Sequence, residues 1–279
     1  MLILKTAAET QSACARLRGE GRTLGLVPTM GALHEGHLSL VRAARAACDV
    51  VVVSIFVNPT QFGPNEDFSK YPRTFENDCA LLEREGVDLI FAPAVEEMYP
   101  AGASTFVLVE GVSDRLDGAS RPGHFRGVAT VVSKLFHIVV PDKAFFGQKD
   151  AAQVAVLRKM VRDLNFPLQP VACPIVREAD GLALSSRNRY LSEKEREQAL
   201  VLHRALRAVE EKAASGERVS SRLIEVARGV FAKEPSVRVD YVAVVDPDTL
   251  EDVPDIRDSA LVAVAAFVGT TRLIDNVVL

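Results

Sequence analysis

Two histidines stand three residues apart where an apolar strand pattern gives way to a helical one. They are His34 and His37, in the segment PTMGALHEGHLSLVRAA (28–44), which also holds Gly31 and Gly36. Residues three apart on a helix share one face, so both imidazoles can point at one ligand, and glycine lets the backbone approach that ligand closely. A zinc site, a phosphate site and helix capping without chemistry all fit this spacing.

Zinc fits this pattern least well. The metalloprotease pattern HExxH places its histidines four apart, whereas HEGH places them three apart, and no cysteine stands nearby. A helix N-terminus at the carboxyl end of a parallel strand instead offers free N–H groups and a positive dipole end, which suit phosphate. We therefore favour phosphate, although the chain has neither a GxxxxGK[ST] loop nor a GxGxxG loop after a strand. Capping alone stays open as the alternative.

Two further segments carry side chains suited to phosphate. GQKD (147–150) places Lys149 directly after a strand pattern, and LSSRNR (184–189) offers two hydroxyls and Arg187 in a connecting segment. Ammonium and guanidinium groups bind phosphate oxygens, and a connector can act as a mobile clamp over a site. A surface Lys–Asp pair and a polar linker remain the ordinary alternatives for each segment taken alone.

The elements that must position these segments alternate between strand and helix. Strand patterns cover 23–29, 49–58, 87–93, 143–147 and 168–176, and helical patterns cover 38–44, 74–86, 127–139 and 150–165. The β-branched run at 49–58 is typical of a strand buried on both faces. The alternation predicts an α/β fold, a Rossmann-like parallel sheet with helices on both faces, over residues 1–176. Ligands bind such sheets at the carboxyl ends of the strands, where PTMGALHEGH, SIFVNPTQF and FFGQKD all lie.

The pattern changes after residue 176. A charged amphipathic helix is expected over 191–217, where Ser192 and Glu195 are spaced as a capping box, and a second helix over about 219–234. Strand patterns follow in 237–250 and 259–279. We expect residues 177–279 to form a smaller α+β domain that closes over the site.

The composition excludes several classes of protein. With 33 basic and 37 acidic residues among 279, the net charge of −4 gives no basic surface for nucleic acid or anionic membrane. No apolar run approaches the roughly 20 residues that span a bilayer. The start lacks the pattern of a signal peptide, and the four isolated cysteines are expected to be reduced thiols. The expected partners are small molecules, and the expected compartment is the cytoplasm.

Six segments in register resemble the pantoate–β-alanine ligase family, within the nucleotidyltransferases that carry an HIGH motif. They are PTMGALHEGH, SIFVNPTQF, YPRT, RPGHFRGVATVV, FFGQKD and READGLALSSRNRYL. HEGH resembles the HIGH motif itself, and LSSR resembles a counterpart of the KMSKS loop. The resemblance covers essentially the whole chain. It implies an enzyme that joins pantoate to β-alanine with ATP and Mg²⁺ through a pantoyl adenylate, and it implies a homodimer.

The resemblance also assigns residues to the site. His34, His37, Lys149 and Arg187 would be the catalytic groups, and Gln61 and Gln153 would hold pantoate. The ATP site would comprise Met30, Gly31, Ala32, Leu33, His34, Glu35, Gly36, His37, Gly147, Gln148, Lys149, Asp150, Val176, Leu184, Ser185, Ser186 and Arg187.

The chain departs from the family at two positions. Leu184 replaces the usual Met, a volume-conserving exchange. Asn77 precedes Asp78 where some members carry two acids linked to magnesium, so Asp78 is the remaining candidate metal ligand.

Three rivals share parts of this pattern. A nucleotidylyltransferase acting on a phosphorylated acceptor would share the histidine segment but does not predict Gln61 and Gln153 together. An aminoacyl-tRNA synthetase would need a basic face for tRNA, which the charge balance argues against. A nucleotide-sensing module would bind ATP without turnover.

In the chemistry that the resemblance implies, the ionised carboxylate of pantoate needs alignment and charge neutralisation more than a base, and His37 is a candidate to protonate the departing pyrophosphate.

Overall fold

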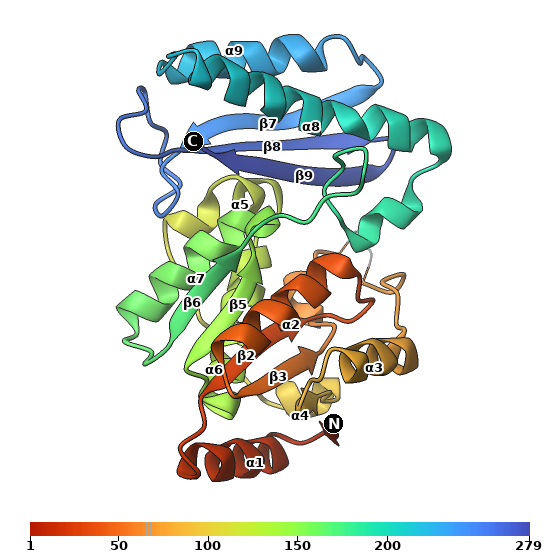
Figure 1. The fold of residues 1–279 in the computed structure, drawn as a ribbon, viewed down its shortest axis with the longest axis vertical. Coiled ribbons are helices and arrows are strands. Elements are labelled where there is room, and N and C mark those ends of the chain that lie inside the picture. Colours follow the sequence, from red (N-terminus) through yellow and green to blue (C-terminus); the bar gives the residue numbers. More distant parts are fainter. Residues whose placement is uncertain (65, 67) are drawn as a thin grey trace.

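Two β-sheets of different kinds organise the chain (Figure 1). The structure, a computed structural model, describes residues 1–64, 66 and 68–279. The first sheet is parallel, in the order β1-β4-β3-β2-β5-β6, with strands β1 (Leu2–Leu4), β2 (Leu24–Thr29), β3 (Val50–Ile55), β4 (Leu89–Phe91), β5 (Lys143–Gly147) and β6 (Gln169–Cys173). The second sheet is antiparallel, in the order β7-β8-β9, with strands β7 (Val237–Val245), β8 (Leu261–Val268) and β9 (Thr271–Val278).

Helices cover both faces of the first sheet and the outer face of the second (Figure 1). The helices along the first part of the chain are α1 (Ala7–Gly19), α2 (Glu35–Ala47), α3 (Phe75–Arg84), α4 (Val95–Met98), α5 (Asp117–Ser120), α6 (His124–Val139) and α7 (Ala151–Asp163). The short 3₁₀ turns are η1 (Pro59–Gln61), η2 (Val112–Asp114), η3 (Gln148–Asp150) and η4 (Ser186–Tyr190), and α8 (Glu193–Ala214) and α9 (Ser220–Phe231) pack on the small sheet. The predicted fold class is confirmed.

Strand β3 explains why the parallel sheet needs two layers of helices. Val50 and Val52 pack into one core with α1, α6 and α7, whereas Val51 and Val53 pack into another with α2 and α3. All four side chains are fully buried. Successive strand residues point to opposite faces, so a run of valines without alternation buries both faces, as the sequence predicts.

The central strands of the sheet diverge at their carboxyl ends. β2 pairs with β3 along its whole length, from Leu24↔Val50 to Thr29↔Ile55, but it pairs with β5 only at Gly25↔Lys143 and Leu26↔Ala144. Strands β3, β4 and β1 lie on one side of β2, and β5 and β6 lie on the other side. Such a switch point leaves a crevice outside the strand ends, where ligands of this fold class bind.

The small sheet packs against helices of the first sheet. Val245, Leu250, Leu261 and Ala263 from the C-terminal part join the same core as α6 and α7. This shared core contains residues from both sides of the predicted boundary at 176/177. The division into 1–176 and 177–279 therefore stays a prediction. None of the helices in the described residues has the length and apolar character that a bilayer-spanning segment requires.

The first element pair is not among the sequence predictions. β1 has only three residues, too few for a periodic pattern. Helix α1 is marked instead by a capping box, in which Thr6 accepts from the Glu9 N–H and Glu9 accepts from the Thr6 N–H. Helix α6 begins at His124, three residues before the predicted start at 127.

Candidate active site

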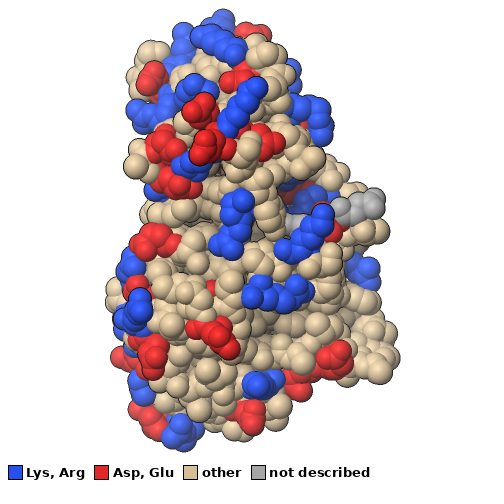
Figure 2. Space-filling model, turned by 90° about the vertical axis from the view of Figure 1, so that its right-hand side faces the viewer, with Lys and Arg blue, Asp and Glu red and all other residues tan. Residues whose placement is uncertain are grey.

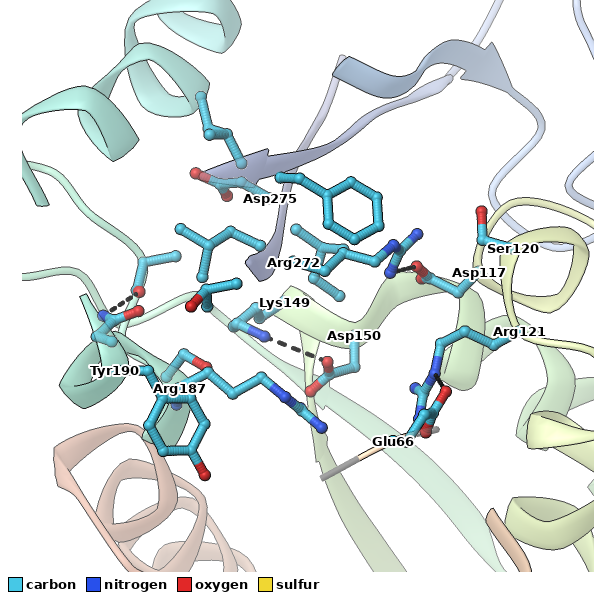
Figure 3. A pocket seen from close by; sticks show the side chains of 18 of the residues that line it. Glu66, Asp117, Ser120, Arg121, Lys149, Asp150, Arg187, Tyr190, Arg272 and Asp275 are labelled. Carbon is cyan, nitrogen blue, oxygen red and sulfur yellow. Dashed lines mark hydrogen bonds and ion pairs between the residues drawn. The ribbon is translucent and has the colours of Figure 1, made fainter. Parts of the chain in front are cut away.

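A cavity of about 660 Å³ lies above the crevice at the end of β5, closed on its far side by β9 (Figure 3). Its lining comes from α5, the start of α6, η3, α7, the segment 182–190 that connects the two sheets, and β9. Lys149, Asp150, Gln153, Ser185 and Arg187 are the sequence-predicted site residues among that lining. Segments that are far apart in the sequence therefore meet at one place.

The turn between β2 and α2 is held by a buried carboxylate. Asp78, only 1 % exposed, accepts hydrogen bonds from the Ala32 N–H at 2.9 Å and the Leu33 N–H at 2.9 Å. The turn needs this support because Gly31 and Ala32 have φ values of 78° and 51°, and a left-handed conformation costs a residue with a Cβ about 1–2 kcal/mol. A Cβ on Gly31 would lie 2.9 Å from an Asp78 oxygen, so only glycine fits there.

His34 and His37 cap the helix that follows through one ring nitrogen each. His34 Nδ1 accepts from the Gly36 N–H at 3.1 Å, and His37 Nδ1 accepts from the His34 N–H at 3.3 Å. An Nδ1 that accepts carries no proton, so each neutral ring has its proton on Nε2. The two ring centroids lie 4.1 Å apart. Each histidine therefore caps the helix through Nδ1 and carries an N–H donor on Nε2.

Both histidines are held in the neutral form. Burial, reinforced by the neighbouring His34, lowers the pKa of His37 to about 3, and burial together with Lys149 lowers the pKa of His34. A neutral Nε2–H donates a hydrogen bond to an anion but is a poor acid. Both rings are therefore suited to donate hydrogen bonds, and the proton transfer expected of His37 stays a prediction.

Lys149 and Arg187 place two cations in the cavity (Figure 3). The Lys149 Nζ lies 3.4 Å from Asp150 Oδ1. Burial alone would raise the pKa of Asp150, but Lys149 and Arg187 outweigh it and lower that pKa. Arg187 comes from the connecting segment and Lys149 from the turn after β5, so opposite walls supply the positive charge.

The connecting segment rests directly on the histidine turn. Ser186 Oγ donates to the Ala32 carbonyl at 3.4 Å, and the Leu184 side chain faces Gly36. The Leu184 N–H donates to the Val176 carbonyl at 3.0 Å, and Ser185 Oγ accepts from the Arg187 N–H at 3.2 Å. The structure therefore brings 31–37 and 184–187 together, as the resemblance implies.

Gln61 is fixed by a buried amide network behind the cavity. Its Nε2 contacts Met30 Sδ at 3.1 Å, and its Oε1 accepts from Asn58 Nδ2 at 3.1 Å. Asn58, 1 % exposed, also donates to the Gly127 carbonyl and accepts from the Tyr99 hydroxyl. A Cβ on Gly127 would lie 2.3 Å from the Thr60 carbonyl oxygen, so α6 packs backbone to backbone on η1. Gln153 lies apart from this network, on α7.

One cluster in the cavity comes from the segment RPGHFRG, to which the sequence reasoning gave no role. Arg121 forms a double hydrogen bond with Glu66 at 2.8 and 2.6 Å, and its Nη1 lies 2.9 Å from His124 Nε2. Burial and Arg121 lower the pKa of His124 to about 4. In the sequence, only the resemblance of this segment to the family could have marked Arg121 as a site residue, because its partner Glu66 lies 55 residues away.

A second cluster that the sequence reasoning missed joins the two sheets. Arg272 on β9 pairs with Asp117 of α5 at 2.7 Å and with Asp240 of β7 at 2.8 Å. Several Lys and Arg side chains lie near the middle of the face shown in Figure 2. Five basic side chains line the cavity, namely Lys70, Arg121, Lys149, Arg187 and Arg272, together with the carboxylates Glu66, Asp117, Asp150 and Asp275. Ion pairs therefore offset part of the positive charge of the cavity.

The surroundings of Asp78 do not fit a metal ion. Both of its oxygens accept from backbone N–H groups, and Thr74 Oγ1 lies 3.1 Å from one of them. In the part of the chain that the structure describes, no three His, Cys, Asp or Glu side chains come together as a metal site would require. The metal role predicted for Asp78 thus gains no support from its contacts.

Comparisons with known proteins agree with this geometry. The family model described as pantoate-beta-alanine ligase matches residues 2–278. The chain is 72 % identical to a pantothenate synthetase of Acidobacterium capsulatum over 95 % of this chain and 89 % of the relative, and 63 % identical to one of Koribacter versatilis over 100 % and 96 %. The crystal structure of pantothenate synthetase from Thermus thermophilus is 50 % identical, with a TM-score of 0.94 and 99 % of both chains covered. A pantoate-beta-alanine ligase from Francisella tularensis, complexed with beta-gamma ATP and beta-alanine, is 33 % identical, with a TM-score of 0.80 over 99 % of this chain and 97 % of that one.

The low pKa of His37 predicts how stability depends on pH. Its pKa falls from 6.5 to about 3 on folding, so the unfolded chain binds a proton that the folded chain excludes, and stability falls as the pH drops from about 6.5 toward 3. At pH 5 this histidine should cost about 2 kcal/mol. Between pH 7 and pH 5, the unfolding free energy of wild type should fall by about 2 kcal/mol more than that of His37→Gln, as measured by urea unfolding at the two pH values.

The exposed histidine on α6 supplies a matched control for this experiment. His137→Gln makes the same substitution away from the site. Equal losses of stability in wild type and His37→Gln would contradict the neutral, buried state assigned to His37.

Proposed function

Because this chain belongs to the pantoate–β-alanine ligase family, we propose that its reaction runs in two steps through a pantoyl adenylate held at the switch point of the parallel sheet. The chain is a ligase that joins pantoate to β-alanine and uses ATP. The observation that carries the two-step proposal is that Lys149 and Arg187 line one cavity, while His34 and His37 lie near enough to Lys149 for its charge to lower their pKa values.

In the first step a carboxylate oxygen of pantoate attacks the α-phosphorus of ATP. The bond from that phosphorus to the bridging oxygen breaks, and pyrophosphate leaves with the electron pair. The carboxylate is already ionised, so the protein has to align it and to neutralise the phosphates. Lys149 and Arg187 supply charge, whereas His34 and His37 supply neutral Nε2–H donors beside the N–H groups at the start of α2.

Gln61 and Gln153 are the proposed pantoate ligands. An amide offers both a donor and an acceptor without adding charge, so it can bind the hydroxyls and the carboxylate of pantoate next to a polyanion. The contact of Gln61 with Met30 supports this role, because Met30 directly precedes the turn assigned to ATP. Gln153 supports it from the cavity wall.

In the second step the amine of β-alanine attacks the acyl carbon of the mixed anhydride, and AMP leaves. Alkyl amines are protonated at neutral pH, with a pKa near 10, so the amine must lose a proton before it attacks. The unit 177–279 is proposed to close over the site, and its connecting segment would keep water from the anhydride. The contacts of Leu184 and Ser186 with the histidine turn support this role.

Magnesium enters the proposal as the ion that ATP carries on its phosphates. Asp78 is not proposed as its ligand, because both Asp78 oxygens accept from backbone N–H groups. We also propose that the enzyme works in the cytoplasm, which four free cysteines support and which cell fractionation would test.

A homodimer is the proposed assembly. Phe106 and Leu108, two residues apart in the N-terminal part, are 45 % and 54 % exposed, and a second copy of the chain would remove this apolar surface from water. Equilibrium sedimentation should give twice the monomer mass of 30.3 kDa, and a monomer at all concentrations would contradict the proposal.

The order of the steps predicts an exchange reaction. With ATP, Mg²⁺ and pantoate but no β-alanine, the enzyme should exchange labelled pyrophosphate into ATP, because the first displacement needs no amine. Lys149→Ala should lower the exchange rate by about a hundred- to a thousandfold, the usual cost of a lost transition-state donor.

Lys159→Ala, on the helix α7 that follows the turn of Lys149 and paired with Asp163, is the matched control and should exchange like wild type. Exchange that appears only after β-alanine is added would overturn the two-step reaction. Exchange that requires a phosphorylated acceptor would indicate a nucleotidylyltransferase, and ATP binding without exchange would indicate a sensor.

A further inference from the structure

Strand β9 is the edge of the small sheet, and two consecutive residues on it reach two different segments of the active site. Asp275 and Asn276 are each 3 % exposed. Successive side chains on a strand point to opposite faces, so the pair straddles the sheet. Asp275 meets the segment that carries Arg187, and Asn276 meets the turn that carries Lys149.

The Asn276 amide is used entirely on the turn η3. Its Nδ2 donates to the carbonyl oxygens of Gln148 at 2.9 Å and Lys149 at 3.0 Å, and its Oδ1 accepts from Gln148 Nε2 at 3.2 Å. An amide side chain can donate two hydrogen bonds and accept one in this arrangement, whereas a carboxylate or an alkyl side chain cannot. The contacts join the backbone of a proposed catalytic residue to the other sheet.

Lys149 has little else to fix it. It lies in a three-residue turn between β5 and α7, and its Nζ pairs with Asp150, whose side chain is 49 % exposed. A lysine carries its charge on a flexible stem of four carbons, so the position of its Cα decides where the ammonium can reach. The Asn276 bonds hold the peptide groups on both sides of that Cα.

Asp275 gives the same strand a hold on the connecting segment. Arg177 binds it with two hydrogen bonds, at 2.6 and 2.9 Å, and also donates to the Gly181 carbonyl at 3.1 Å. Arg177 stands at the start of the segment that ends in Ser185 and Arg187. One strand therefore sets the separation between Lys149 and Arg187, which face the same space in Figure 3.

We propose that Asn276 is a positioning residue that holds Lys149 in place for the attack on ATP. The inference rests on the role proposed for Lys149. A displacement of about 1 Å at a reacting group can cost about a hundredfold in rate. Loss of the Asn276 bonds should therefore lower kcat while the binding of pantoate, which Asn276 does not touch, changes little.

The test uses pyrophosphate exchange with Asn276→Asp and Asn276→Ala. Asn276→Asp keeps the shape but turns an oxygen toward two carbonyl oxygens. In both variants kcat should fall by about 10- to 100-fold, with KM for pantoate within about threefold of wild type.

The control variant removes a different link between the C-terminal part and the N-terminal part, on the helix α7 that follows η3. Asp248 pairs with Arg158 of α7 at 3.3 Å, at an exposed position away from Lys149. Asp248→Asn is isosteric in the same way and should keep wild-type kcat. Urea unfolding of each variant identifies a general loss of stability, and Asn276→Ala serves if Asn276→Asp does not fold.

A double-mutant cycle decides whether Asn276 acts through Lys149. In the Lys149→Ala background, Asn276→Ala should change kcat by less than about threefold, since coupled residues are not additive. An undiminished effect in that background, or no effect on kcat in the wild-type background, overturns the inference. If Lys149→Ala alone keeps wild-type kcat, the proposed role of Lys149 fails; if Lys149→Ala loses activity and Asn276→Ala does not, only this inference fails.

Discussion

The pair of hydrogen bonds from the Ala32 and Leu33 N–H groups to Asp78 is the interaction on which the rest of the site depends. Burying a carboxylate is unfavourable unless hydrogen bonds replace its hydration, and Asp78 at 1 % exposure receives them from the turn. In return it holds Ala32 at a φ of 51°. Without that conformation the chain would not turn from β2 directly into a helix whose first residues are His34, Glu35, Gly36 and His37.

The remaining parts of the site are placed against this turn by the two sheets. The divergence of β2 from β5 opens the crevice, and it brings the ends of both strands to the same edge. The connecting segment closes one side through Ser186 and Leu184, and β9 closes the other through Asn276. The positive charges of Lys149 and Arg187 thus depend on tertiary contacts from both sheets, whereas the histidines depend on local capping.

Much of this arrangement follows from sequence patterns with a short range. The valine run of β3, the capping box at Ser192 and the strand ends before Met30 and Lys149 were predictable, because periodicity and caps act within a few residues. Phosphate binding and capping are competing hypotheses for His34 and His37; the structure shows capping through Nδ1, and phosphate binding through Nε2 stays a prediction. The two hypotheses describe different nitrogens of the same rings.

What the sequence did not reveal depends on partners far away in the chain. The family resemblance made Asp78 a candidate metal ligand, but it could not show that both of its oxygens meet N–H groups 45 and 46 residues distant. Arg121 with Glu66, and Asn276 with the Lys149 carbonyl, are separated by 55 and 127 residues. No local pattern encodes such pairs, so only the fold brings them together.

Asp78 holds the turn that is proposed to face the ATP phosphates, and Asp78→Asn tests this role most directly. An amide has one acceptor oxygen and would point its NH₂ group at a backbone N–H, so the unfolding free energy should fall by about 2–3 kcal/mol. The KM for ATP should rise while the Mg²⁺ concentration for half-maximal rate at saturating ATP stays unchanged, with the exposed Asn77→Ala as control. A variant of wild-type stability that requires more Mg²⁺ would contradict the claim and make Asp78 a metal ligand.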